Sequence, residues 1–145
     1  MTLSVLLILA VVGGIGWHYV AQRRRVAAST WAMAVLVTDV AQLARFQDSY
    51  NDVRARIQWV RPDTIQSPVL RAAVRIHPGP LPKPYTTGWG KVWAPGAMPD
   101  VIDPFGTIVL RADKQAWFDH EAAHAITGIP DHPPWLFRPD GSLNV

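Results

Sequence analysis

The spacing of apolar residues changes once within the first sixty positions. Residues 3–20 (LSVLLILAVVGGIGWHYV) are mostly apolar and carry no formal charge, which is close to the shortest run that crosses a bilayer as a helix. From about residue 30 to residue 60, apolar residues recur at spacings of three, four and seven, which predicts one long amphipathic helix. Ser29 or Thr30 can cap its start. Pro62 predicts its end, because a proline disfavours helical conformation in the residue before it.

Further along, the pattern predicts two short strands separated by a proline-rich loop. Apolar and basic residues alternate over residues 74–77, which favours a half-buried strand, and the apolar run at residues 107–110 (TIVL) favours a second one. Between them, residues 78–104 hold more than half of the prolines, so this stretch cannot continue a helix and can join a sheet only at an edge. The tryptophans of residues 88–93 predict an ordered arm, either a wall or lid over a site or filler for the core.

The basic charge is concentrated beside the apolar run. The formal net charge is +3 and the pI is near 9.7, but residues 1–28 contain three arginines and no acid, and the remaining chain has eleven basic and eleven acidic residues. The excess therefore indicates a membrane flank and not a nucleic-acid surface. We interpret residues 3–20 as a transmembrane helix in preference to a cleaved signal peptide, with the bilayer as a partner. Basic residues after the helix place the C-terminal part on the cytoplasmic side or in a virion interior.

Two further classes of chemistry find no support in the sequence. The chain has no cysteine, which excludes disulfides, thiolate metal ligands and a cysteine nucleophile. No glycine-rich phosphate loop is present, since the clustered glycines of residues 13–16 lie within the apolar run. Candidate chemistry must therefore come from histidines and carboxylates.

Residues 119–128 (DHEAAHAITG) contain the pattern His-Glu-x-x-His in a stretch that the sequence predicts to be helical. His120 and His124 lie one turn apart on one helix face, and Glu121 is close enough to share it. Two imidazoles at this spacing can hold one zinc ion, and a neighbouring carboxylate can take a proton from the water that the metal activates. The motif therefore predicts the chemistry of a zinc peptidase.

A catalytic zinc site usually has three protein ligands and one open position. His132 is the first candidate for the third ligand, because the turn predicted after the helix can bring the chain back towards the metal. Asp131 is the second candidate and His77 the third. Asp113 is a suitable N-cap for the motif helix, and Gly128 is a suitable stop.

Residues 107–137 resemble the core of the zincin metallopeptidases, with a strand, an active-site helix and a later ligand. The end of this stretch, residues 132–137 (HPPWLF), is similar to the small SprT-like and minimal gluzincin-type peptidases, where aromatic residues follow a histidine beyond the helix. The resemblance implies hydrolysis of peptide bonds, with Zn²⁺ on the two motif histidines and His132. It implies that Glu121 accepts the proton of the attacking water and passes it to the leaving amine.

Other residues have less defined roles. Tyr85, Arg138 and His77 are candidate donors to the oxyanion that develops during hydrolysis. Asp119 is expected to point away from His120. We therefore interpret it as a solvated carboxylate or as one that supports a metal ligand. The strand at residues 107–110 could pair with an extended peptide substrate.

Together these observations predict an α+β protein. A transmembrane anchor (residues 1–28) precedes a small zincin-like domain (residues 29–145) built from the long amphipathic helix, a short sheet, the active-site helix and the proline-rich loop. The predicted function is a membrane-anchored zinc-dependent endopeptidase, in a compact design typical of a phage product. The alternative is a single-pass structural or assembly protein whose histidine pair is not catalytic. Residues 30–60 could also form a short coiled coil that joins two copies of the chain.

Overall fold

The computed structural model describes residues 12–22, 24–25, 33–79, 90–93 and 105–145. The chain divides into two compact units, Met1–Met33 and Ala34–Val145. In the described part of the first unit, residues 12–22 are helical, and Trp17 and Tyr19 are exposed.

The described residues do not support the predicted anchor. In the ranges that the structure describes, no helix has both the length and the apolar character needed to cross a membrane. A span requires about 20 apolar residues, and the described helical residues 12–22 include three glycines and His18. The predicted transmembrane helix over residues 3–20, and the membrane localisation inferred from it, are therefore wrong. Residues 3–11 lie outside the described residues.

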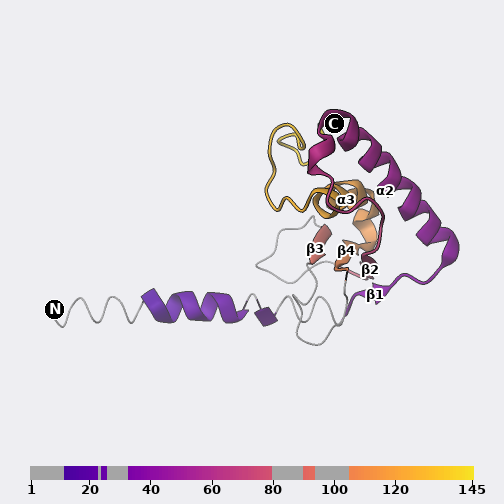
Figure 1. The fold of residues 1–145 in the computed structure, drawn as a ribbon. Helices are drawn as coiled ribbons and strands as arrows, with labels where there is room; N and C mark the ends of the chain where they lie inside the picture. Colours follow the sequence, from indigo (N-terminus) through magenta and orange to yellow (C-terminus); the bar gives the residue numbers. More distant parts are fainter. Residues whose placement is uncertain (1–11, 23, 26–32, 80–89, 94–104) are drawn as a thin grey trace. The chain divides into compact units, whose positions relative to one another are not determined.

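The second unit is α+β and contains a four-stranded sheet in the order β1-β2-β4-β3 (Figure 1). Its strands are β1 (Val35–Leu36), β2 (Ala73–His77), β3 (Gly90–Trp93) and β4 (Thr107–Arg111). The inner strands β2 and β4 are parallel, and each outer strand is antiparallel to its neighbour. Most of the proline-rich stretch, at residues 80–89 and 94–104, lies outside the described residues, so its predicted role as a lid stays a prediction.

Strand β4 is the centre of this sheet. All five of its residues are buried, and it forms hydrogen bonds with β2 on one edge and β3 on the other. The uniformly apolar run at residues 107–110 fits a strand covered on both faces. Because both edges of β4 are occupied, the prediction that it could pair with a substrate peptide is wrong.

The long helix α2 (Val40–Val60) starts later than the apolar pattern predicted. The side chain of Asp39 caps it by accepting a hydrogen bond from the Gln42 backbone N–H at 2.7 Å. Residues 35–36 form β1 instead of helix, and the predicted cap residues 29 and 30 lie outside the described residues. The predicted end before Pro62 is confirmed, since a short 3-10 helix, η1 (Pro62–Thr64), follows. Buried side chains of α2 lie along one stripe: Phe46, Tyr50, Val53 and Ile57.

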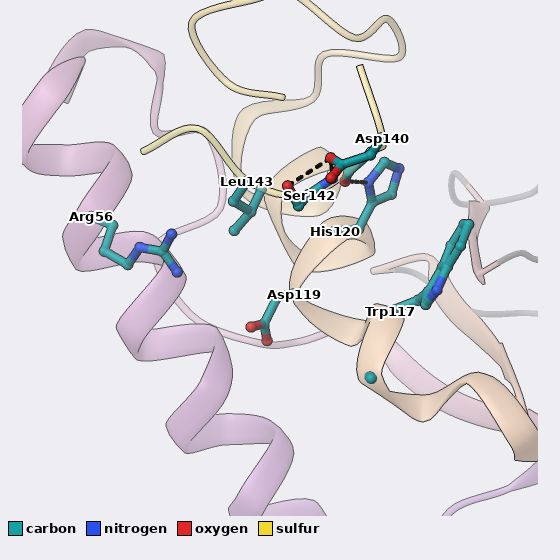
Figure 2. A pocket seen from close by; sticks show the side chains of 9 residues that line it. Arg56, Trp117, Asp119, His120, Asp140, Ser142 and Leu143 are labelled. Carbon is teal, nitrogen blue, oxygen red and sulfur yellow. Dashed lines mark hydrogen bonds between the residues drawn. The ribbon is translucent and has the colours of Figure 1, made fainter. Parts of the chain in front are cut away.

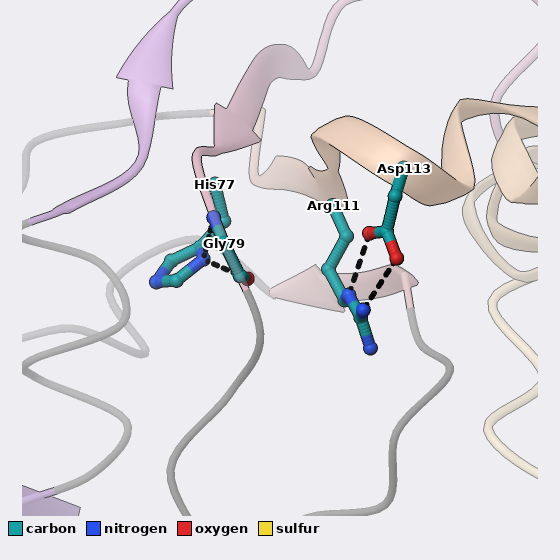
Figure 3. Close-up of polar contacts among 4 residues, drawn as sticks. All are labelled: His77, Gly79, Arg111 and Asp113. Carbon is teal, nitrogen blue, oxygen red and sulfur yellow. Dashed lines mark hydrogen bonds and ion pairs between the residues drawn. The ribbon is translucent and has the colours of Figure 1, made fainter.

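The motif helix α3 (Phe118–Thr127) follows an irregular 3-10 stretch, η2 (Ala112–Trp117). Asp113 does not cap α3, because its carboxylate accepts a hydrogen bond from Arg111 Nε at 2.8 Å (Figure 3). The predicted stop at Gly128 is confirmed. Gly128 has a left-handed φ of 67°, and its N–H donates to the His124 carbonyl at 2.8 Å.

Helix α3 lies within the core of the second unit. It contacts α2 and the strands β3 and β4, and the rings of Phe46 and Phe118 join the two helices at a centroid separation of 4.6 Å. Residues 128–145, which we call the C-terminal segment, add Leu136, Phe137 and Leu143 to the same core. The motif is therefore held by packing from the sheet, from α2 and from the C-terminal segment.

Candidate metal centre

Three imidazoles converge at one end of α3. The Nε2 atoms of His120 and His124 are 3.2 Å apart, and His132 Nε2 lies 3.1 Å from the first and 3.3 Å from the second. Helical spacing brings His120 and His124 together, and the turn after Gly128 returns the chain so that His132 reaches them. These three residues lie close enough to hold a metal ion.

Two backbone carbonyls fix the tautomers of the helical pair. His120 Nδ1 donates to the Gly141 carbonyl at 2.6 Å, and His124 Nδ1 donates to the Ile129 carbonyl at 2.6 Å. A neutral imidazole that donates from Nδ1 has its lone pair on Nε2. Both converging Nε2 atoms are therefore in the state that binds a metal, and the carbonyls hold the rings in orientation.

The spacing of the three nitrogens matches a tetrahedral zinc site. Zn–N bonds of about 2.0–2.1 Å at tetrahedral angles place two nitrogen ligands about 3.3 Å apart. Observed Nε2 separations are 3.1–3.3 Å. The lone pairs of unprotonated nitrogens repel at this distance, and a cation between them relieves that repulsion.

Burial favours the neutral imidazoles. Desolvation lowers the pKa of both His120 and His124 below the usual value for histidine, although their hydrogen bonds to backbone carbonyls oppose the shift. Metal binding requires neutral histidine. The protein environment thus keeps the helical pair ready for a metal near neutral pH.

Glu121 is a buried carboxyl beside the three histidines. Only 5% of its surface is exposed. Burial raises its pKa to about 7, while a hydrogen bond from the Val92 backbone N–H and the charge of Lys91 oppose the shift. A carboxyl with a pKa near 7 can accept and release a proton at neutral pH.

Glu121 and the three histidines line one open cleft of about 670 Å³. Strand β3, at the edge of the sheet, contributes Lys91 and Val92 to its wall. Two smaller cavities of about 430 and 400 Å³ lie on another side of His120. Figure 2 shows the first of them, with Asp140 and Ser142 beside the His120 ring.

Other residues predicted for the site lie elsewhere. Asp131 is exposed and His77 is buried in β2, where its Nδ1 lies 2.8 Å from the Gly79 carbonyl oxygen (Figure 3). In the described part of the chain, neither belongs to the group of convergent ligand atoms. Asp119 accepts a hydrogen bond from the Ser49 hydroxyl and so connects α3 to α2. Arg138 is exposed and lines the 400 Å³ cavity.

Tyr85, the remaining candidate for the oxyanion donor, lies outside the described residues. No sequence pattern selects the carbonyls of Ile129 and Gly141 or the ring of Phe137, which contacts all three histidines. Residues 139–142 (PDGS) are a recognisable turn sequence, which signals a reversal near the end of the segment. However, the residues of this turn do not indicate that the Gly141 carbonyl accepts a hydrogen bond from His120 on α3.

No protein-family model, curated protein or solved structure matches the chain. The functional interpretation of the metal centre therefore depends on its own geometry and on the residues that surround it.

Proposed function

We propose that this chain is a zinc-dependent endopeptidase that uses Glu121 as its general base. The observation that carries the proposal is the convergence of three Nε2 atoms at 3.1–3.3 Å in the cleft that Glu121 also lines. A histidine triad alone is compatible with several metals, and a buried carboxyl alone has many roles. Their combination at one cleft is the arrangement that metal-assisted hydrolysis requires.

The ligand set favours zinc in a catalytic site. Three neutral imidazoles suit zinc among the common metals, and three protein ligands leave one tetrahedral position open. Structural zinc sites usually have four protein ligands, whereas His120, His124 and His132 form a group of three in the described part of the chain. This count supports a catalytic site over the alternative of a structural metal in an assembly protein.

When bound, zinc supplies a water of lowered pKa and a Lewis acid for the scissile carbonyl. Glu121 takes the proton from the attacking water and delivers it to the leaving amine. The raised pKa of Glu121, about 7, suits both transfers because the carboxyl is then a stronger base than an exposed glutamate. The Val92 N–H holds the carboxylate in place at the edge of the cleft.

The shape of the surroundings supports cleavage within a chain. The main cleft and the 400 Å³ cavity share His120 and His132 as walls but extend over different elements. Space on both sides of the histidines allows a peptide to continue in both directions from the scissile bond. An exopeptidase would instead require one side to be closed.

Zinc content and hydrolysis of an unstructured protein such as casein test the proposal together. The chain should bind one zinc per molecule and cleave the substrate, and Glu121→Gln should keep the zinc while hydrolysis falls by about 10²–10⁴-fold. Asp131→Asn is the matched control, because it neutralises a carboxylate beside His132 that lies outside the ligand group. This control should retain both zinc and activity.

Two results would contradict the proposal. A wild-type chain that binds no zinc at micromolar concentration removes the metal centre. A chain that binds zinc but cleaves no peptide, with Glu121→Gln indistinguishable from wild type, indicates a structural metal and favours the assembly protein.

A further inference from the structure

Phe137 contacts every imidazole of the triad. The centroid of its ring lies 4.6 Å from that of His120, 4.7 Å from that of His124 and 4.9 Å from that of His132. The three imidazole centroids are themselves 4.9–5.0 Å apart. The four rings therefore form a compact cluster with nearly equal separations.

This geometry places Phe137 on the axis of the triad. A ring that is almost equidistant from three others lies on the line through their centre, above or below their common plane. Phe137 is 2% exposed and belongs to the hydrophobic core. The three histidines line the 670 Å³ cleft together with Glu121, whereas Phe137 is not among the residues that line it. Phe137 instead lines the 400 Å³ cavity together with His120 and His132. It therefore packs on the triad from a different side than the 670 Å³ cleft that Glu121 lines.

We infer that Phe137 is a positioning residue, which packs against all three imidazoles and thereby fixes the separation of the nitrogens that would bind the metal. This inference rests on the zinc binding proposed above. The ring has no atom that binds zinc, and it acts through the imidazoles by filling the space against which they pack. It thereby sets the separation and the orientation of the three rings.

The backbone around Phe137 is built to hold that position. Its N–H donates to the Pro133 carbonyl at 3.0 Å, and Phe137 forms an isolated bridge with Leu143. The same stretch carries His132 before it and the Gly141 carbonyl that orients His120 after it. The C-terminal segment thus supplies His132, an orienting acceptor for His120 and the ring that packs on all three histidines.

Two substitutions separate a role at the metal from a role in the core. Phe137→Ala removes the ring, and Leu136→Ala removes a side chain that is equally buried, at 0% exposed, in the same core but has no ring to stack on the histidines. Both should lower the melting temperature of the metal-free protein. Only Phe137→Ala should weaken zinc binding, by about 10–100-fold, as expected when support for metal ligands is lost.

Zinc affinity is measured by competition with a chromophoric chelator at a temperature where each metal-free variant is folded. Cobalt substitution gives a second readout, because the intense visible bands of four-coordinate Co²⁺ weaken when extra ligands enter. Phe137→Ala should show this weakening and Leu136→Ala should not. If Phe137→Ala does not fold, Phe137→Leu takes its place, with a zinc affinity reduced about 10-fold.

The outcomes distinguish this inference from the proposed function. Equal zinc affinity in wild type and both variants, or an equal loss in both variants, overturns the role of Phe137 and leaves the metal centre intact. A wild type that binds neither zinc nor cobalt overturns the proposed function itself.

Discussion

Helices α2 and α3, the two α-helices in the described part of the second unit, differ in the kind of side chain that they bury. Helix α2 buries one stripe of four side chains, none of them charged, and is capped by Asp39. Helix α3 is about half as long, lacks a side-chain cap and buries Glu121 among apolar neighbours. Burying a carboxyl costs free energy unless it is neutralised or hydrogen-bonded. The first helix contributes stability to the fold, whereas the second gives up some stability by burying a carboxyl.

The contrast extends to what surrounds each helix. One face of α2 is exposed along its length, and the helix is held by its buried stripe and by hydrogen bonds of Ser49 and Arg56 to Asp119 and Val145. Around α3, the C-terminal segment supplies the acceptors for His120 and His124 and adds His132. A short helix can hold a metal ion here because other parts of the chain complete the group of three histidines. Substitutions in α2 should therefore change stability alone, and substitutions in α3 should change chemistry.

Ile57→Ala should give the largest change in stability. Ile57 is fully buried in α2, and truncating a buried isoleucine costs about 2–5 kcal/mol of unfolding free energy. Urea denaturation of the metal-free protein measures this loss. Zinc affinity of the folded variant should equal that of wild type, and a reduced affinity would show that α2 has more than a packing role.

Glu121→Gln should stabilise the metal-free protein at high pH. Because the folded-state pKa of Glu121 is about 7 against an ordinary 4.5, the folded state binds this proton more tightly than the unfolded state does. The associated stability is present below pH 4.5 and is lost as the pH rises towards 7. Relative to the variant, wild type should lose roughly 3 kcal/mol between pH 4.5 and pH 8.

Urea denaturation of both proteins at several pH values, with a chelator present, measures that difference. The histidines titrate in both proteins, so their contribution cancels in the comparison. If the difference in unfolding free energy between the two proteins stays constant across this pH range, burial of Glu121 has no cost. That result would contradict the proposed difference between α2 and α3.

Asp39→Ala should give the smallest effect. Loss of the hydrogen bond to the Gln42 N–H should cost about 1 kcal/mol of unfolding free energy. Asp52→Ala is a suitable control, since its ion pair with Arg56 is exposed and 3.8 Å long, and such pairs contribute about 0–1 kcal/mol. An effect no larger than that of the control would show that α2 is held by packing alone.

Local rules predicted the parts of the site that depend on local spacing. His120 and His124 follow from the helical repeat, and His132 follows from the turn that Gly128 begins. The carbonyls of Ile129 and Gly141 could not be predicted, because every residue has a carbonyl and only the folded chain determines which one meets an imidazole.

The errors in the fold have a similar origin. Apolar residues at positions 36 and 40 fit the helical repeat of α2, but Leu36 pairs with β2 and Asp39 starts the helix later. Asp113 is a residue type that often caps helices, but its carboxylate accepts a hydrogen bond from Arg111 instead. The sequence predicts a strand at residues 107–110 but not its central position in the sheet. That position depends on β3, which forms the edge strand. At Leu36 and in β4 a tertiary partner competed with a local preference, whereas at Asp113 the competing partner is only two residues away.

X-ray absorption at the zinc edge of the zinc-loaded chain tests the central claim most directly. Three histidine nitrogens and one water oxygen at about 2.0–2.1 Å are predicted, with one zinc per chain. His132→Ala should lower the number of histidine ligands from three to two. A six-coordinate spectrum dominated by oxygen, or one unchanged in His132→Ala, would contradict the claim that these three imidazoles bind one metal ion.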